Sequence, residues 1–326
     1  MSEAKPEVSF PEIAERYPLG PRVKVLAAHP AGLIALEKPV SVLSHPNSRK
    51  DKKHSLIMAH YDDKRECYYD LNSSDDRLYL CHRLDAATSG VILLAQNETA
   101  AQMMRKRFEE RRVDKLYYAI VRGRPHSAHD TWIDHIERSQ MPNQRPSQRA
   151  PLKPLLMRSK MLFVGMDKNR LGLSLIKLSP YTGRTHQLRL QCSWRMHPIL
   201  GDKTYGDFML NRALARALPY ERMYLHASEL AFEFLHKGEL QKMTITSELP
   251  QSFNALLETN RDLLKIHLNV PKFRRAPLPF SADSVAQHKK KQARMAKKVA
   301  QSRQRPSGTP SPKKTQKRPP RPDKAT

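Results

Sequence analysis

Cysteine is scarce in this chain of 326 residues, which holds three, Cys67, Cys81 and Cys192. Their wide spacing gives none of the close pairs of a structural zinc site, and an odd number does not suit a disulfide framework. A reducing compartment is therefore expected. The chain also lacks an apolar run of membrane-spanning length, and its first residues lack the apolar stretch of a secretory signal peptide. We expect a soluble, cytoplasmic protein without a membrane partner.

Acidic residues are also few. The chain has 32 Asp and Glu against 58 Lys and Arg, a formal net charge of +26. An excess of this size and sign indicates a polyanionic partner, the alternative being a merely soluble basic protein. Residues 271–326 hold 17 Lys and Arg against two Asp, together with nine prolines. Such a segment cannot bury enough apolar surface to offset its chain entropy, so we expect a disordered basic tail.

The body between an irregular lead (1–20) and this tail (271–326) is long enough for a sizeable core. Strand-like and helix-like stretches alternate in it without the regularity of βαβ units, which predicts an α+β fold with a mixed, mostly antiparallel central sheet and flanking helices and loops. The predicted strands are 23–28, 33–36, 78–84, 91–95, 116–121, 171–178, 224–234 and 240–246; the predicted helices are 100–112, capped by Asn97, 186–192 and 251–260; and 137–154 is a predicted loop.

The most informative block runs from Cys81 to Gly90, C-H-R-L-D-A-A-T-S-G, and leads into an apolar run. Its one acid is Asp85, and a lone Asp near a turn is usually a helix cap or a surface charge. On an extended backbone Arg83 and Asp85 point the same way, because side chains alternate. Thr88 supplies a hydrogen-bond donor in the turn. An aspartate kept anionic in this setting can act as a nucleophile.

A second block, K-L-Y-Y-A-I-V-R-G, runs from Lys115 to Gly123 and reads as a strand. Tyr117 shares one strand face with apolar residues, and a buried tyrosine is most often simply packed, with its hydroxyl satisfied. The block alone therefore leaves a packing role and a site role for Tyr117 both open.

A third block, T-G-R-T-H-Q-L-R-L, runs from Thr182 to Leu190. It reads as a turn that opens a helix, whose N-terminus presents free N–H groups to a phosphate. Arg184, His186, Gln187 and Arg189 add donors for a phosphate or a base edge, although a charged surface turn and helix would look the same. No Cys or acid stands at metal-ligand spacing from His186, so we assign no metal.

Together these blocks resemble the signature of the RluA-type pseudouridine synthases, enzymes that isomerise uridine within RNA. The family pattern is H-R-L-D-x-x-T-S-G, then K-x-Y-x-A, then T-G-R-T-H-Q-I-R leading to H-P-I-L-G-D-x-x-Y-G, and the chain matches it in order and spacing. Residues 197–206, H-P-I-L-G-D-K-T-Y-G, complete the third part. An early Glu37-Lys38-Pro39 and M-Y-L-H-A-S-E-L at 223–230 also match, so the resemblance covers about residues 21–250.

The resemblance implies a pseudouridine synthase fold over residues 21–270 and a reaction without metal or cofactor. Asp85 would be the essential aspartate, acting on the ribose or on the uracil, and Arg184 would pair with it and hold it ionised. Tyr117 would stack beside the target base, and Arg83 would fill the gap left when the uridine is flipped out of its stack. Further contacts to RNA are expected from His82, Thr88, Lys115, His186, Gln187 and Arg189. We expect a monomer acting on ribosomal RNA, transfer RNA or both.

The chain departs from the family pattern in three places. K-P-V-S-V has no glycine at position 41, and Gln191 stands where many members have histidine, so both positions are expected to alter the local backbone or the fit to RNA. Only about 20 residues precede the body, too few for the small RNA-binding module of many relatives. We expect the basic tail to supply the missing RNA affinity.

Two other functions fit the composition. One is a non-catalytic RNA-binding or ribosome-assembly factor on the same fold, which has no need of Asp85, Tyr117 and Arg184. The other is a DNA-binding protein that uses its basic tail, for which no helix-turn-helix or zinc pattern is present. The sequence therefore favours the enzyme.

Overall fold

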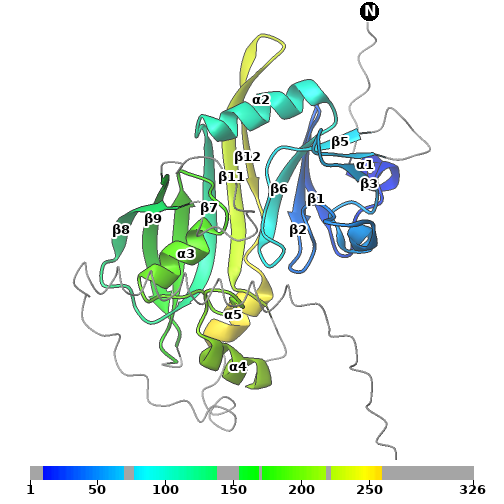
Figure 1. Ribbon diagram of the computed structural model, residues 1–326. Helices are drawn as coiled ribbons and strands as arrows, with labels where there is room; N and C mark the ends of the chain where they lie inside the picture. The colour runs from blue at the N-terminus through cyan, green and yellow to red at the C-terminus, as the bar shows by residue number, and fades with distance from the viewer. Residues whose placement is uncertain (1–9, 70–76, 138–153, 169–170, 218–221, 259–326) are drawn as a thin grey trace, which may run out of the picture.

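The computed structural model describes residues 10–69, 77–137, 154–168, 171–217 and 222–258. Their strands form one 12-stranded sheet whose main path is β3-β4-β5-β6-β11-β7-β10-β9-β8, with β1 beside β2, β2 also beside β6, and β12 beside β11 (Figure 1). Among the described strands β6 and β11 pair in parallel, and the other pairs are antiparallel. The expected α+β fold with a mostly antiparallel sheet is confirmed.

The elements follow one another along the chain as α1 (Phe10–Arg16), β1 (Lys24–His29), β2 (Leu33–Lys38), the short 3-10 helix η1 (Arg49–His54), β3 (His60–Asp62), β4 (Cys67–Tyr69), β5 (Arg77–Leu80), β6 (Ser89–Ala95), α2 (Glu98–Glu109), β7 (Val113–Arg122), β8 (His129–Ile136), β9 (Leu155–Met166), β10 (Leu173–Pro180), α3 (Gln187–Trp194), α4 (Phe208–Ala217), β11 (Leu225–His236), β12 (Glu239–Thr246) and α5 (Gln251–Glu258).

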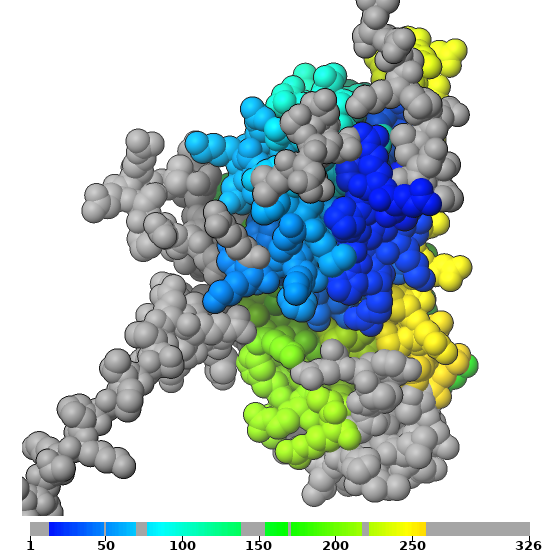
Figure 2. All heavy atoms as spheres, turned by 90° about the vertical axis from the view of Figure 1, so that its right-hand side faces the viewer, coloured from blue at the N-terminus to red at the C-terminus, as the bar shows by residue number. Residues whose placement is uncertain are grey.

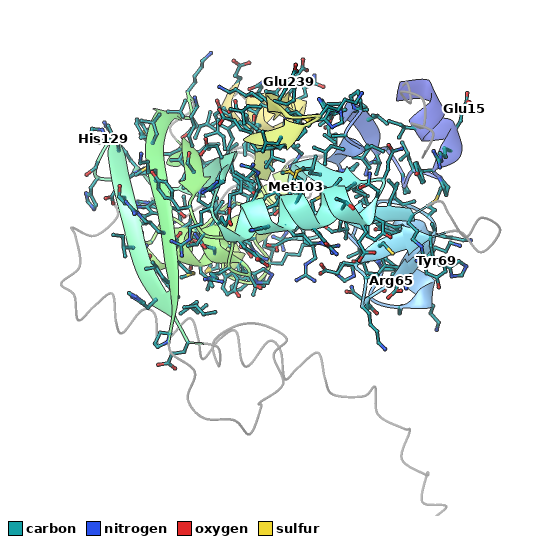
Figure 3. All side chains as sticks on the ribbon, turned by 90° about the horizontal axis from the view of Figure 1, so that it is seen from above. Glu15, Arg65, Tyr69, Met103, His129 and Glu239 are labelled. Atoms are coloured by element: carbon teal, nitrogen blue, oxygen red, sulfur yellow. The ribbon has the colours of Figure 1, made fainter. Side chains whose placement is uncertain are left out.

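Strand β6 pairs with β2, β5 and β11, and all seven of its residues are buried. Helix α2 lies across the middle of the molecule when it is seen from above, with β8 and β4 toward opposite ends (Figure 3). Its N-cap is Asn97, whose side chain accepts from the N–H of Ala100 at 2.8 Å. Ala101 and Met104 of its inner face join a core cluster with β6. An apolar run covered on both faces explains why β6 shows no polar alternation.

The half of the sheet made by β7, β10, β9 and β8 carries α3 on one face. Leu188 and Cys192 of α3 pack on Ala119 and Ile176. The opposite face of the same strands, beginning with Ile120, is covered at one end by α4 and α5. Because neighbouring strand residues point to opposite faces, Ala119 and Ile120 meet different helices. From the side in Figure 2, the N-terminal strands form one face, with α4 and α5 below.

Gly90 of β6 lies directly against the backbone of Ala227 in β11. Its φ is +115°, and a Cβ there would lie 2.1 Å from the carbonyl oxygen of Ala227. The last position of the Cys81–Gly90 block therefore requires glycine, because both the backbone conformation and the contact exclude a side chain. This contact holds the end of that block against β11.

Several predicted elements are confirmed, and others were missed. The strands predicted at 33–36, 91–95, 116–121 and 240–246 and the helices at 100–112, 186–192 and 251–260 all exist, with shifted ends. The strand predicted at 78–84 stops at Leu80, and Arg83 and Asp85 lie in the loop that follows it, on either side of the buried Leu84. Helices α1 and α4 and strands β8 and β9 were not predicted. Most of the predicted loop at 137–154 and the whole predicted tail at 271–326 lie outside the described residues.

Candidate active site

Asp85 lies in the loop between β5 and β6, and hydrogen bonds fix this loop on both sides of it. The hydroxyl of Ser44 donates to the carbonyl oxygen of Leu84 at 2.7 Å and accepts from the N–H of the same residue at 3.0 Å. After Asp85, the N–H of Thr88 donates back to the Asp85 carbonyl oxygen at 3.0 Å. The carboxylate is thus presented from a fixed backbone without any strand at that position.

Arg189 of α3 forms the ion pair with Asp85. Its Nη1 lies 3.0 Å from Oδ2 of Asp85, while Nε and Nη2 donate to the two carboxylate oxygens of Asp202 at 2.7 and 2.8 Å. Burial would lower the pKa of Arg189, but its bonds to Asp202 and Asp85 raise it above its usual value. Arg189 is a buried, fixed cation that Asp202 orients toward Asp85.

His186 lies near the same carboxylate oxygen of Asp85. Its Nε2 lies 3.7 Å from Oδ2 of Asp85, and its Nδ1 lies 3.1 Å from the hydroxyl of Tyr205. Burial lowers the pKa of His186, and the charge of Asp85 opposes that shift only in part. Its φ of +55° costs roughly 1 kcal/mol for a residue with a Cβ. The chain accepts this strain where the imidazole meets the carboxylate.

Tyr117 and Lys115 lie on one face of β7, because their positions differ by two. Tyr117 packs against two core clusters, one that includes Ile92 of β6 and one that includes Leu188 of α3. Burial raises the pKa of Tyr117, and the charge of Asp85 adds to this, so the hydroxyl stays protonated. Burial lowers the pKa of Lys115 to about 8. Tyr117 therefore gives the site an aromatic wall, and Lys115 adds an ammonium group of reduced basicity to the same face of β7.

Lys38 is the one fully buried ammonium group in the described part of the chain. It donates to the carbonyl oxygens of Val42 at 2.7 Å, Pro39 at 3.0 Å and Ala86 at 3.1 Å. Burial lowers the pKa of Lys38 to about 7, against the opposing effect of Asp85. By bonding Ala86, Lys38 anchors the residue that follows the aspartate.

The site thus holds a fixed carboxylate, an oriented guanidinium and an aromatic wall, and comparisons with known proteins decide the family. Residues 32–194 match the family described as RNA pseudouridylate synthase. The tRNA pseudouridine synthase C of Haemophilus ducreyi is 33% identical over 236 residues, which cover 69% of this chain and 90% of that protein. The chain belongs to the RNA pseudouridylate synthase family, in its RluA-type branch.

Two further similarities agree with this assignment. The ribosomal large subunit pseudouridine synthase C of Escherichia coli strain K12 is 32% identical over 197 residues, 57% of each chain. The solved structure titled Human RNA Pseudouridylate Synthase Domain Containing 4 aligns with a TM-score of 0.53 at 22% identity, covering 74% of this chain and 92% of that one. The pseudouridine synthase fold is thereby shown, and the chain is an RNA-modifying isomerase.

In this pseudouridylate synthase the ion pair expected between Asp85 and Arg184 is formed by Arg189 instead. The Nε of Arg184 donates to the carbonyl oxygen of Leu156 at 3.5 Å. Both arginines lie in one sequence block, five positions apart. The helical start at Gln187 turns Arg189 inward while Arg184 stays in the preceding turn. Spacing alone did not say which of the two faces the carboxylate.

Three residues expected to contact RNA have side chains held inside the protein. The Nε2 of His82 accepts the N–H of Leu93 at 3.0 Å, and burial lowers the pKa of His82 to about 3. The amide of Gln187 accepts from the Thr182 hydroxyl at 2.7 Å and donates to Ser159 at 2.9 Å. Arg189 is held by two carboxylates. Their geometry favours a role in shaping the site over a contact to RNA.

The other expected contacts divide by exposure. Thr88 is buried, with its N–H in the turn that closes on Asp85, whereas Arg83 is exposed beside that turn. His186 beside Asp85 and Lys115 on β7 are half-buried. Arg83, Lys115 and His186 therefore remain the expected contacts that an RNA strand can reach.

The two single-residue departures from the family pattern, Ser41 and Gln191, have structural roles. Ser41 has a φ of +67°, a conformation that a glycine adopts without cost, so serine is strained there. Its N–H nevertheless donates to the carbonyl oxygen of Ala86 at 2.8 Å. Gln191 is buried between Ser159, which donates to it at 2.7 Å, and the Asp134 carboxylate, to which it donates at 3.0 Å. Neither residue touches Asp85.

Lys38, Asp202 and Tyr205 were not assigned a role from the sequence, although the blocks containing them were noticed. The polar residues of E-K-P and G-D-K-T-Y could have indicated these positions. A linear pattern does not show, however, that Asp202 accepts two hydrogen bonds from Arg189, 13 positions earlier. In the described residues no group of three or more His, Cys, Asp or Glu is placed to hold a metal ion, and no helix is long and apolar enough to cross a membrane.

Proposed function

We propose that Asp85 is the catalytic residue of this isomerase and that its substrate is transfer RNA. The observation that supports the role of Asp85 is a contrast in exposure: its side chain is 27% exposed, whereas that of its partner Arg189 is 7% exposed. RNA can reach the carboxylate but not the cation behind it. A reactive group presented by a buried, orienting partner is the usual arrangement of a nucleophile or base.

The reaction fits a single carboxylate. The bond between N1 of uracil and C1′ of the ribose breaks, a new bond forms between C5 and C1′, the proton of C5 leaves and N1 gains one. Asp85 attacks or assists at the ribose or at the ring, and Tyr117 stacks beside the base. The exposed Arg83 occupies the space that the flipped uridine leaves, at a flipping cost of roughly a few kcal/mol, smallest in loops and ends.

Transfer RNA is the proposed substrate because of how completely the relatives are matched. The chain covers 96% of the tRNA pseudouridine synthase C of Pasteurella multocida at 32% identity. It covers 57% of the Escherichia coli enzyme named for the ribosomal large subunit. Ribosomal RNA is the second candidate on that second similarity.

The proposal extends to where and how the enzyme works. We place it in the cytoplasm, which suits three cysteines that are all free and buried in the structure. We propose that it acts as a monomer and that residues 271–326 add sequence-independent affinity for RNA. Truncation after Val270 is expected to weaken RNA binding and flatten its salt dependence, and unchanged affinity and slope would refute this role.

The substrate is tested by incubating the protein with two unmodified RNAs labelled with tritium at C5 of uridine: pooled transfer RNA transcripts and large-subunit ribosomal RNA. Release from transfer RNA, with the product mapped to a defined position, supports the proposal. Release from ribosomal RNA alone would overturn the substrate and leave the activity. No release from either, despite tight binding, would favour a non-catalytic RNA-binding factor.

A further inference from the structure

Strands β8, β9 and β10 separate their charges by face. The two acids of these strands, Asp130 and Asp134, lie on the side of Trp132: Asp130 accepts from its Nε1 at 3.0 Å, and Asp134 accepts from Arg195 at 2.8 Å. This is the face that α3 covers and that leads to the active site. The opposite face of the same three strands carries no acid.

That opposite face is basic and aromatic. Lys177 of β10 stands directly between Tyr118 of β7 and Leu162 of β9 in the strand register, and directly paired residues share a face. Its Nζ lies 5.4 Å from the centre of the Tyr118 ring. Two more cations, Arg158 and Lys160, follow along β9. We call these residues, with Tyr181, the outer face: Tyr118, Arg158, Lys160, Leu162, Lys177 and Tyr181.

The cations of the outer face are available. Arg158 and Lys160 are exposed, and neither they nor Lys177 has an ion-pair partner among the described residues. Arg158 and Lys160 both pack over the ring of Tyr181, at 4.9 and 5.5 Å from its centre. Beside them Leu162 is 44% exposed. Cations interleaved with aromatic and apolar side chains bind the phosphates and unstacked bases of RNA.

The outer face is continuous with the active site through one turn. This turn begins at Tyr181, under the two cations, and ends at His186, whose Nε2 is 3.7 Å from Asp85. Arg184 lies between them and is bonded to the backbone of β9. A strand of RNA leaving the active site therefore meets a basic residue in the turn before it reaches the cations of β9.

Charge excludes two other occupants. Residues 271–326 of the chain itself carry 17 Lys and Arg against two Asp and would be repelled. A second copy placed by two-fold symmetry would set the same basic residues against one another. A polyanion remains, and the activity already brings one to this protein.

We propose that the outer face is a second RNA-binding surface, which holds a part of the substrate RNA away from the target uridine. RNA that enters the active site passes the turn 181–186 and continues over β9 and β10. The surface selects for large folded RNA over an isolated stem-loop, because only the former extends far enough to cover it. The inference depends on the transfer RNA substrate proposed above only for the choice of probe.

The test compares the double variant Arg158→Glu/Lys160→Glu with wild type on two unmodified probes. One is a full-length transfer RNA transcript, and the other is the stem-loop of that transcript that contains the target uridine. The matched control is Lys237→Glu/Lys242→Glu, an equal change of charge on exposed residues of the β11–β12 hairpin. Dissociation constants are measured over a series of salt concentrations, together with melting temperatures and tritium release from both probes.

We expect the outer-face variant to bind the full-length transcript at least tenfold more weakly and to lower the slope of log affinity against log salt by roughly 1.5 to 2. The affinity for the stem-loop and its turnover should stay within twofold of wild type, and the melting temperature within a few degrees. The control variant should behave as wild type in every measurement. Arg158→Gln/Lys160→Gln gives a smaller loss of the same kind.

An unchanged affinity and slope, or an equal loss in the control, would overturn the second surface and leave an acidic protein as its partner. If wild type releases no tritium from either transfer RNA probe, the proposed substrate fails, while the binding comparison on the full-length transcript still decides the outer face.

Discussion

One guanidinium, that of Arg189, connects two carboxylates: its Nη1 lies 3.0 Å from Asp85, and its Nε and Nη2 hold Asp202 at 2.7 and 2.8 Å. Asp202 is almost fully buried, whereas Asp85 is open to substrate. Asp202 therefore fixes the direction of the cation, and the cation holds the carboxylate that we propose as the catalytic group.

The first prediction separates the two arginines of the T-G-R-T-H-Q-L-R-L block. Arg189→Gln should lower turnover on the order of 10²-fold, because Asp85 loses its orientation, and should cost about 3 kcal/mol of stability, because Asp202 is left buried and unpaired. Arg184→Gln should keep the melting temperature and should lower turnover much less. Single-turnover rates and thermal melts of both variants decide this. A larger loss of rate in Arg184→Gln would return the pairing role to that residue.

The second prediction concerns Lys38. Lys38→Met removes the donor for three carbonyl oxygens and should cost about 2 kcal/mol. The pKa of Lys38 is about 7 in the fold and 10.5 in the unfolded chain, so between these values the unfolded state binds more protons. The free energy of unfolding therefore rises with pH across this window in wild type, by up to about 1.4 kcal/mol per unit, and the variant lacks this rise.

Urea unfolding of both proteins at pH 7, 8 and 9 measures the difference. The exposed Lys242→Met is the control and should follow wild type at each pH. A wild-type advantage over Lys38→Met that stays constant from pH 7 to 9 would show that Lys38 titrates normally in the fold.

The third prediction is a loss of stability in acid. Burial lowers the pKa of His226 to about 4 and that of His82 to about 3, from 6.5. Below pH 6.5 these two imidazoles bind protons in the unfolded chain but stay neutral in the folded protein. The free energy of unfolding therefore falls as the pH drops from 6.5 to 4. His226→Gln should fall less steeply, and His54→Gln, an exposed histidine, should fall as wild type does. Equal slopes in all three proteins would contradict the buried neutral imidazole.

The strands with strong apolar character could be predicted from the sequence, and so could the loop that contains Asp85. Strand β6 is the clearest case, because it is buried on both faces and its apolar run is unbroken. Strand β9 could not be predicted in the same way. Exposed Arg158 and Lys160 alternate there with buried Ser159 and Met161, which gives a mostly polar stretch. The alternation is visible once the outer face is known to be in contact with solvent.

The sequence predicted most residues of the site but not the contacts between them. Asp85 and Tyr117 come together as expected. The partner of Asp85 was misassigned because the choice between Arg184 and Arg189 depends on where the α3 helix begins. Asp202 and Lys38 act through buried contacts to residues 13 and 48 positions away, which no local pattern contains.

The measurement that tests the central claim is tritium release from RNA labelled at C5 of uridine, by wild type and by Asp85→Asn, with RNA affinity measured on the same preparations. The substitution is nearly isosteric and leaves the loop bonds to Ser44 and Thr88 in place. We predict release by wild type alone, with both proteins binding RNA within a few-fold of one another. Release by Asp85→Asn at a comparable rate would contradict the account, because the reaction would then proceed without the carboxylate that Arg189 holds.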